Sequence, residues 1–371
     1  MSVSAQLDAK ALRARFPVLG RLAYLNAGTD GPLPSVAVSA AADELEREAA
    51  NGRTHRHFER RGELNGSLRA AYASILECAP EDIALTTCTS EGLSLVIEGL
   101  RLGSGDEILT SDEEHPGLLG ALSAAAQVHG VAIREAPWAQ LPDAIGPRTT
   151  LVACSHVSWM TGRLAPAALS EIDVPLLLDG AQGAGAVPTD VGALRCAAYA
   201  GAGQKWLCGP DGTGMLYVSP ELRARLAVTR RGYANLADPG AGLHATLHED
   251  ARRLDTLSLS AEAVACALAA FEVLAGAGWT AVHERARSLA ASLAEQLSAR
   301  GRALAVESER EREGATLISF ASSDPVAERE RLAERGVVLR DIPGRPWLRA
   351  SVGAWNDEDD LARLLDALDA S

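Results

Sequence analysis

Between about residue 83 and residue 218, seven short apolar runs alternate with helical patterns, and this rhythm constrains the fold more than any other feature. The runs are IALTT, DEILTS, VAIREA, TTLVACS, VPLLLDG, CAAYAGA and GMLYVS. Strands that alternate with helices form a largely parallel sheet with crossover helices. The apolar positions between Leu93 and Leu100 follow the period of an amphipathic helix, which predicts a helix that starts near Thr89 and Ser90.

After about residue 258 the sequence becomes rich in Ala, Leu, Arg and Glu, which predicts helices over roughly 260–300. Strands are expected near 315–320 and 347–352, and a final helix from about 357. We therefore predict an α/β protein with a large domain, residues 22–257, whose sheet is mainly parallel. A smaller α+β domain is expected to combine residues 1–21 with residues 258–371.

Composition limits the classes of partner. The chain has 371 residues, of which 47% are hydrophobic, and this is enough to bury a large core. Its net charge of −14 argues against binding to nucleic acid, so the arginine-rich stretch at 54–61 is interpreted as a solvated helix face or a site rim. No apolar run approaches the roughly 18 residues of a membrane span, and the N-terminus lacks the apolar region of a signal peptide. We expect a cytoplasmic protein without membrane contact.

Lysine is almost absent from this chain. Only Lys10 and Lys205 accompany 33 arginines among the 35 basic residues. An amine can lose its proton when it is desolvated and then attack a carbonyl, whereas a guanidinium stays charged. Lys10 lies in a polar terminal segment and is interpreted as a solvated charge. Lys205 lies in an apolar, glycine-rich stretch, and is a candidate for amine chemistry as well as for an ordinary buried lysine.

Four motifs together could hold a flat cofactor that carries a phosphate. Thr89 and Ser90 in TTCTSEGL would begin a helix whose free N–H groups attract a phosphate. Asp179 ends the run VPLLLDG at the carboxyl edge of the sheet, where a carboxylate can hold a pyridine nitrogen protonated. Lys205 could form a Schiff base, and His115 in SDEEHPGLL could lie over the ring. Each motif alone has an ordinary structural explanation, but their combination is specific.

The sequence resembles the aminotransferase class V family, which includes cysteine desulfurases, selenocysteine lyases and isopenicillin N epimerase-like proteins. The resemblance runs from YLNAGTDGPLP at 24–34 to LRASVGAWNDEDDL at 348–361, and DGAQ followed by GQKWLCGPDGTGMLYV is its most specific part. It implies the fold of the PLP-dependent transferases of type I, with pyridoxal 5′-phosphate (PLP) as cofactor and no metal. It also implies a homodimer with a shared active site and a small amino acid as substrate.

The resemblance implies a role for each residue that faces the cofactor. Lys205 would carry PLP as the internal aldimine, and Asp179 would pair with the pyridine nitrogen. Gln182, three residues after Asp179, would contact the ring hydroxyl, and His115 would stack on the ring.

The phosphate and the substrate carboxylate are assigned in the same way. The resemblance places Thr89 and Ser90 at the phosphate, together with Ser258 in DTLSLS from the neighbouring subunit. Arg349 would receive the α-carboxylate of the substrate, a role that suits its bidentate fork, and Arg340 is a second candidate.

One further residue of the matched motifs is expected to contact the substrate, and three residues differ from those usual in the family. Asn26 in YLNAGTDGPLP is expected at the substrate. Ala202 and Gln204 stand where family members often carry Ser or Thr and His, which changes a phosphate contact and the surroundings of the lysine. Trp159 stands where desulfurases usually place an asparagine, so the substrate pocket is expected to differ.

The absence of a suitably placed cysteine disfavours one of the family's reactions. A desulfurase needs a thiolate on a loop over the substrate, but the segment from Gly336 to Arg349 contains no cysteine. The remaining reactions share an external aldimine with an L-amino acid and removal of the α-proton by Lys205, and they diverge afterwards. We prefer transamination on the family resemblance alone. A C–S β-lyase is the close alternative, and an epimerase is the third.

Two other classes stay open. A PLP-fold protein that only binds its ligand is disfavoured by the intact set of Asp179, Lys205, His115 and Arg349. A metal hydrolase built on the histidines of HATLH at 244–248 is disfavoured because the glutamate of an HExxH motif is missing.

Overall fold

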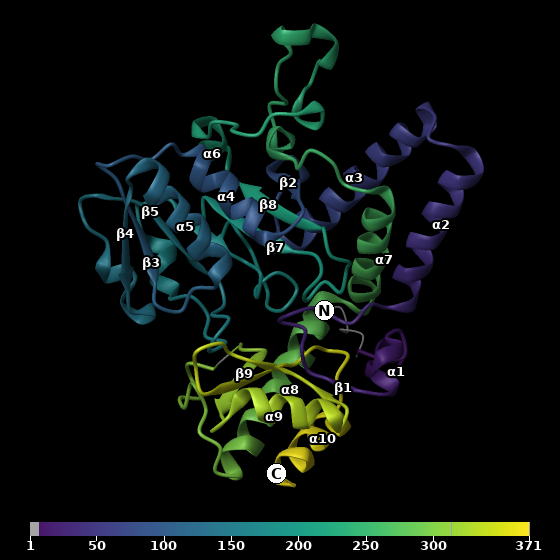
Figure 1. The fold of residues 1–371 in the computed structure, drawn as a ribbon, viewed down its shortest axis with the longest axis vertical. Coiled ribbons are helices and arrows are strands. Elements are labelled where there is room, and N and C mark those ends of the chain that lie inside the picture. The colour runs from purple at the N-terminus through teal and green to yellow at the C-terminus, as the bar shows by residue number, and fades with distance from the viewer. Residues whose placement is uncertain (1–6, 313, 371) are drawn as a thin grey trace, which may run out of the picture.

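The computed structural model describes residues 7–312 and 314–370. Its larger sheet has seven strands in the order β2-β8-β7-β6-β5-β3-β4 (Figure 1). These strands are β2 (Ile83–Thr86), β3 (Glu107–Ser111), β4 (Ala132–Ala136), β5 (Thr149–Ser155), β6 (Leu176–Asp179), β7 (Ala198–Ala202) and β8 (Gly214–Val218). All seven predicted runs are therefore confirmed as strands. From β7 to β4 the neighbours run parallel, while β8 is antiparallel to both β7 and β2.

Helices cover both faces of this sheet. They are α3 (His55–Leu76), α4 (Thr89–Gly99), α5 (Pro116–His129) and α7 (Ala261–Ala277), while α2 (Ser35–Asn51) packs against α7. Leu178 of β6 packs in one cluster with α3 and α7, while its neighbour Leu177 packs in another with α4 and α5. Successive strand residues point to opposite faces, so a strand covered on both faces has to be apolar throughout. The predicted helix that starts near Thr89 is α4 and is confirmed.

A smaller sheet lies next to the larger one (Figure 1). Its strands are β11 (Arg340–Asp341), β12 (Trp347–Ser351) and β9 (Leu317–Ala321), paired antiparallel in that order. A separate parallel pair joins β1 (Ala23–Tyr24) to β10 (Val337–Val338). The helices around it are α8 (Trp279–Ala299), α9 (Pro325–Glu334) and α10 (Glu358–Asp369). The predicted strands near 315–320 and 347–352 and the final helix are confirmed, whereas β1, β10 and β11 were not predicted.

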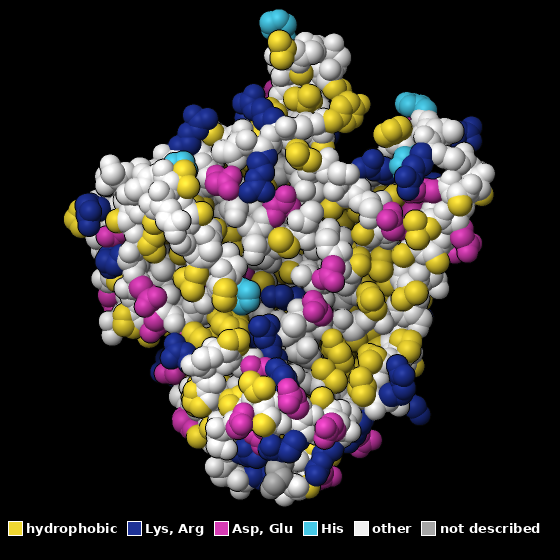
Figure 2. All heavy atoms as spheres, in the orientation of Figure 1, with side chains coloured by type: hydrophobic (Ala, Val, Ile, Leu, Met, Phe, Trp, Pro, Cys, Tyr) yellow, Lys and Arg dark blue, Asp and Glu magenta, His cyan; other side chains and the backbone are white. Residues whose placement is uncertain are grey.

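Two short helices and a projecting arm lie outside these groups. The short helix α1 (Ala9–Arg13) precedes β1, and α6 (Pro220–Arg225) follows β8. Residues 232–248 form an arm that projects from the large sheet, at the top of Figure 1. Tyr233 and Leu243 on this arm are exposed, as are Val38 and Leu45 on α2, and Figure 2 shows apolar side chains on the arm.

Within the described residues, no single helix has the length and apolar character needed to cross a membrane. Only α7 and α8 taken together pass such a test, and they are bent by 82° at the break between them.

Candidate active site

The ends of the parallel strands bring the predicted residues to one edge of the large sheet. Asp179 is the last residue of β6. β7 ends at Ala202, three residues before Lys205, and β3 ends at Ser111, four residues before His115. Because these strands are parallel, their carboxyl ends share an edge, which is where ligands bind in such sheets. Figure 2 shows basic side chains and a histidine gathered where the upper and lower parts of the molecule meet.

Lys205 carries an amine that is poised to lose its proton. Burial lowers the pKa of Lys205 to about 8, while the negative charge of Asp179 raises it and that of nearby Arg349 lowers it. The N-terminal loop approaches this residue closely, since Gly31 N–H donates to the carbonyl of Gln204 at 2.7 Å. A Cβ on Gly31 would lie 2.0 Å from the Lys205 carbonyl oxygen, so only glycine fits there. The arrangement holds an amine with reactivity near neutral pH.

Asp179 is a buried carboxyl that forms no ion pair among the described residues. It accepts a hydrogen bond from Ala181 N–H at 2.9 Å, and burial raises its pKa while Lys205 opposes the rise. Gln182, its predicted neighbour at the ring, donates to the Gly28 carbonyl at 2.7 Å and accepts from Trp206 Nε1 at 3.0 Å. The amide of Gln182 is thereby fixed, and its nitrogen retains one further hydrogen to donate.

His115 is held as a neutral imidazole. It is the N-cap of α5, and its Nδ1 accepts from Gly117 N–H at 3.0 Å, which leaves the proton of the neutral ring on Nε2. Burial lowers the pKa of His115 to about 4, and the charges of Lys205, Arg340 and Arg349 lower it further. A neutral aromatic ring at the sheet edge can lie against a flat ligand without adding charge.

Glu114 belongs to the site, although sequence reasoning did not single it out. Its carboxylate accepts from Ser155 N–H at 2.9 Å, from Ser155 Oγ at 2.6 Å and from Ser111 Oγ. Burial raises the pKa of Glu114 to about 7, and the charge of Asp179 adds to the rise. These bonds tie the loop that carries His115 to the ends of β3 and β5. Both glutamates of the motif SDEEHP are buried, although the sequence alone suggests a polar, solvated loop.

Two arginines are paired on neighbouring strands of the small sheet. Arg340 of β11 lies directly opposite Arg349 of β12. Arg349 is fully buried and donates to the Trp159 carbonyl at 2.8 Å and to Thr29 Oγ1 at 3.4 Å. Burial lowers the pKa of Arg349 to about 9, with Arg340 contributing, so the side chain stays charged at neutral pH. Among the described residues neither arginine forms an ion pair.

The N-terminus of α4 lies close to that of α5. Thr89 is buried at the first turn of α4, and Ser90 is exposed. The Ser90 hydroxyl would be 2.6 Å from a Cβ on Gly117, so the first turns of the two helices lie next to each other. Helix N-termini attract phosphate.

The buried polar atoms of this region test whether the residues fit PLP. Within the described chain, six polar atoms of the region are buried without a hydrogen-bond partner: Asn26 Oδ1, Thr89 Oγ1, Trp159 Nε1, Gln204 Oε1, Arg349 Nε and Ser351 Oγ. Each such group costs about 1–3 kcal/mol, so their concentration indicates a place prepared for a polar ligand. An amine, a carboxylate, a neutral imidazole and a helix N-terminus match the aldehyde, ring and phosphate of PLP. The residues fit this cofactor.

The remaining predicted residues differ in where they lie. Ser258 is exposed on the segment that precedes α7. Asn26 instead lies inside, where its backbone forms a bridge with Ser351 at the end of β12. His244 is on the projecting arm, away from the sheet edge.

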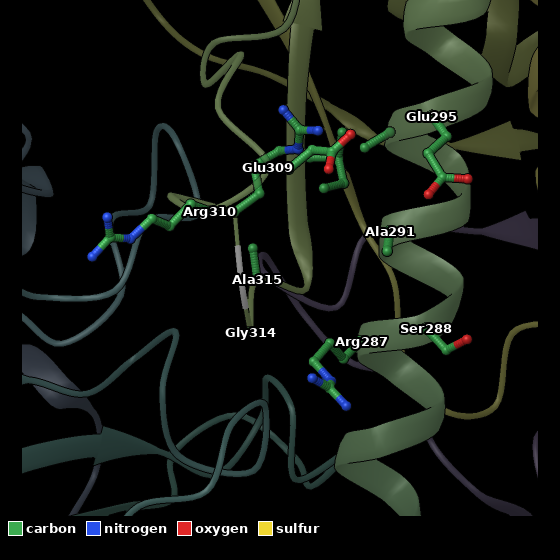
Figure 3. A pocket seen from close by; sticks show the side chains of 11 residues that line it. Arg287, Ser288, Ala291, Glu295, Glu309, Arg310, Gly314 and Ala315 are labelled. Atoms are coloured by element: carbon green, nitrogen blue, oxygen red, sulfur yellow. The ribbon is translucent and has the colours of Figure 1, made fainter.

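A separate cavity of about 500 Å³ lies beside α8 (Figure 3). Arg287 and Glu295 line it from the helix, and Glu309 lines it from the segment opposite. None of the site residues borders this cavity, so it is distinct from the candidate active site.

Comparison with known proteins gives consistent matches over nearly the whole chain. The model of the family Aminotransferase class-V matches residues 23–364. Isopenicillin N epimerase of Streptomyces clavuligerus is 29% identical over 395 residues, which cover 98% of this chain and 98% of that protein. A probable cysteine desulfurase of Pseudomonas aeruginosa is 30% identical and covers 97% of both chains.

The solved structures that resemble this chain include PLP-dependent enzymes that act on sulfur-containing amino acids. A complex of the cystine C–S lyase C-DES with its reaction product cysteine persulfide superimposes with a TM-score of 0.89 at 29% identity, covering 95% of this chain and 98% of that one. A mutant of C-DES with glycine covalently linked to the PLP cofactor gives a TM-score of 0.90 at 29% identity, over 96% of this chain and 98% of the other. The predicted PLP-dependent fold and the predicted cofactor are confirmed.

Proposed function

The chain belongs to the aminotransferase class V family of PLP-dependent enzymes, and on that premise we propose that it cleaves the C–S bond of a cystine-like amino acid. The substrate would be an L-amino acid with a second carboxylate beyond its sulfur. C–S cleavage therefore replaces transamination as the preferred reaction, since the relatives above act as C–S lyases, desulfurases or epimerases by name.

The facing pair of Arg340 and Arg349 carries this proposal. Like charges directly opposite each other on a β-ladder destabilise it. Asp30 interacts with the charge of Arg340, but among the described residues neither arginine forms an ion pair. Two anionic groups of one substrate would remove this cost. Arg349, the buried one, would bind the α-carboxylate, and Arg340 would bind the distal carboxylate. L-cystine has two such carboxylates on either side of a disulfide, which is also the substrate class in the name of C-DES.

The cysteines of the chain support a diffusible sulfur product over a persulfide on the enzyme. Burial raises the pKa of five of the six cysteines, to about 12 for Cys78 and Cys196 and well above the usual thiol value for Cys154 and Cys208. A thiol with so high a pKa is a poor nucleophile. The sixth, Cys88, is half-buried at the start of α4 rather than on a loop over the substrate.

Each site residue would have its own role in the reaction. When bound, PLP supplies an electron sink that makes the α-proton of the amino acid acidic. Lys205 would accept that proton at Nζ, for which a pKa of about 8 is suitable. Asp179 would hold the proton of the pyridine nitrogen, and neutral His115 would cover the ring and exclude water. Overall, cystine and water would give cysteine persulfide, pyruvate and ammonia.

The test is to incubate the purified PLP-loaded enzyme with L-cystine, L-cysteine and L-alanine, with and without an oxo acid. We expect pyruvate and persulfide from cystine over many turnovers, and slower reaction with cysteine. Transfer of the amino group to the oxo acid without pyruvate would make the enzyme an aminotransferase. Inversion at Cα without cleavage would make it an epimerase.

A homodimer is part of this proposal. Ser258 is exposed, and it would reach a PLP phosphate in a second copy of the chain. The exposed apolar residues Tyr233 and Leu243 on the arm are suited to burial between two copies. Sedimentation of the PLP-loaded protein should give twice the mass of 38.8 kDa. A monomer with full activity would exclude a shared site.

A further inference from the structure

We propose that Trp159 is a positioning residue that sets the selectivity of the site for a second carboxylate. The inference rests on the proposed function, because it concerns the same substrate group that Arg340 would bind. The inference goes beyond the proposed function because it names the side chain that holds Arg340 in place.

Trp159 is the residue on which the two arginines converge. The Arg340 guanidinium carbon lies over the Trp159 ring, 5.7 Å from its centroid. Arg349 donates to the backbone carbonyl of the same residue at 2.8 Å. The indole thus supports one arginine through its π face, while the main chain fixes the other.

The indole itself is fixed from the opposite side. Its ring meets the ring of His115 edge to face, with centroids 4.9 Å apart and planes at 84°. His115 is in turn fixed by Gly117 N–H. Trp159 is only 6% exposed, and its Nε1 has no partner in the described chain, so its place is set by packing rather than by its own hydrogen bond.

The loop that carries Trp159 is also rigid. Gly162 N–H donates to the Ser158 carbonyl at 2.9 Å, and Thr161 Oγ1 donates to Glu113 at 2.6 Å. Ser319 of β9 donates to the Met160 carbonyl at 2.6 Å, which ties the loop to the small sheet. The backbone carbonyl that serves Arg349 should therefore stay in place when the indole is replaced.

This separation of main chain and side chain makes a sharp test possible. Changing the indole should affect Arg340 and the distal carboxylate, but not Arg349 and the α-carboxylate. Trp159→Phe retains an aromatic face, and Trp159→Leu is the matched variant that removes it. The probes are glutarate, adipate and suberate, compared with butyrate. None of these has an amino group, so binding to the PLP-loaded enzyme is measured by calorimetry without turnover.

We expect the wild type to bind at least one dicarboxylate more tightly than butyrate. Trp159→Leu should weaken that dicarboxylate about threefold to tenfold and leave butyrate within about twofold, while Trp159→Phe should lose less than about threefold. Arg340→Gln should abolish the preference, and adding Trp159→Leu to it should have no further effect.

Three results would overturn the inference. They are equal weakening of dicarboxylate and butyrate, equal behaviour of the Phe and Leu variants, and an effect of Trp159→Leu that persists without Arg340. A wild type without any preference for dicarboxylates would overturn it as well, together with the role proposed for the two arginines. Release of pyruvate from cystine is measured separately, so failure of the C–S lyase function remains distinguishable from failure of this inference.

Discussion

Arg69 and Arg349 are both buried arginines, but Arg69 is paired with a carboxylate and Arg349 forms no ion pair within the described residues. Arg69 of α3 donates twice to Asp255, at 3.0 and 2.7 Å, and also to the Ile83 carbonyl. Asp255 in turn accepts from Leu85 N–H, so the pair joins α3 to β2. Arg349 is buried more completely, yet its hydrogen-bond partners within the described residues are a carbonyl and a hydroxyl. A buried charge neutralised inside the protein is structural, whereas one left without a counter-charge is available to a ligand.

Lys205 provides the strongest test of this contrast. Lys205→Ala should remove the visible absorbance of lysine-bound PLP and lower turnover by about 10⁴-fold or more. The free energy of unfolding of the cofactor-free protein should not fall, because a desolvated amine is lost. Lys10→Ala, which changes the other lysine, should alter neither property. Retained turnover in the Lys205 variant would contradict the assignment of the site.

The two arginines can be exchanged for glutamine in parallel. Arg349→Gln should lower kcat/KM by about 10²–10³, because a charged partner of the substrate carboxylate is lost, and leave the melting temperature unchanged or higher. Arg69→Gln should lower the free energy of unfolding by about 3–5 kcal/mol, because Asp255 then stays buried without its partner. Its folded fraction should keep kcat/KM within about threefold. If both variants lose stability alike, the contrast between the two sites is wrong.

The pH dependence of stability sharpens the contrast further. The pKa of Lys205 is lowered in the folded protein from 10.5 to about 8, so between these values the unfolded chain binds more protons. Stability of the cofactor-free protein should therefore rise with pH across this window. Lys205→Met should be more stable than the wild type by about 3 kcal/mol below pH 8, and this difference should vanish above pH 10.5. Denaturant unfolding at several pH values measures it. Parallel curves for the two proteins would mean that the amine is not desolvated.

A pair of threonines gives the smallest effect. Thr89 Oγ1 has no partner in the described chain, whereas Thr149 Oγ1 donates to Glu107 at 2.9 Å and accepts from Gly146 N–H at 3.0 Å. Thr89→Val should weaken PLP binding about tenfold without destabilising the cofactor-free protein. Thr149→Val should instead cost about 1–3 kcal/mol and leave PLP affinity unchanged. Equilibrium dialysis and thermal unfolding separate the two outcomes, and a reversed pattern would place the phosphate elsewhere.

Strands buried on both faces were the easiest part of the structure to predict. Continuous apolar runs such as VPLLLDG need no partner to be recognised, and all seven became strands of one sheet. β1 and β10 were missed because a two-residue strand has no period of its own and forms only through its partner far along the chain. Asp179 and Lys205 could be found because each is a polar exception next to such a run.

Other site residues could not be found in this way. Glu114 is recognisable only once the fold places it against Ser155, since SDEEHP reads as a polar loop. The facing of Arg340 and Arg349 depends on the register between β11 and β12, which the sequence does not encode locally. Trp159 was noticed as a departure from the family, but its contact with Arg340 requires the loop after β5 of the large sheet to meet β11 of the small sheet.

The pairing of Ala23 with Val337 has a consequence for how the site is assembled on the ribosome. Translation delivers β6, which ends at Asp179, and β7, which precedes Lys205, well before β10, β11 and β12. The loop that ends with Gly31 against Lys205 is made first of all, yet the strand that anchors its start is among the last to emerge. Such long-range pairing raises the contact order and slows folding. The PLP side of the site can therefore take shape in the nascent chain before the side that selects the substrate.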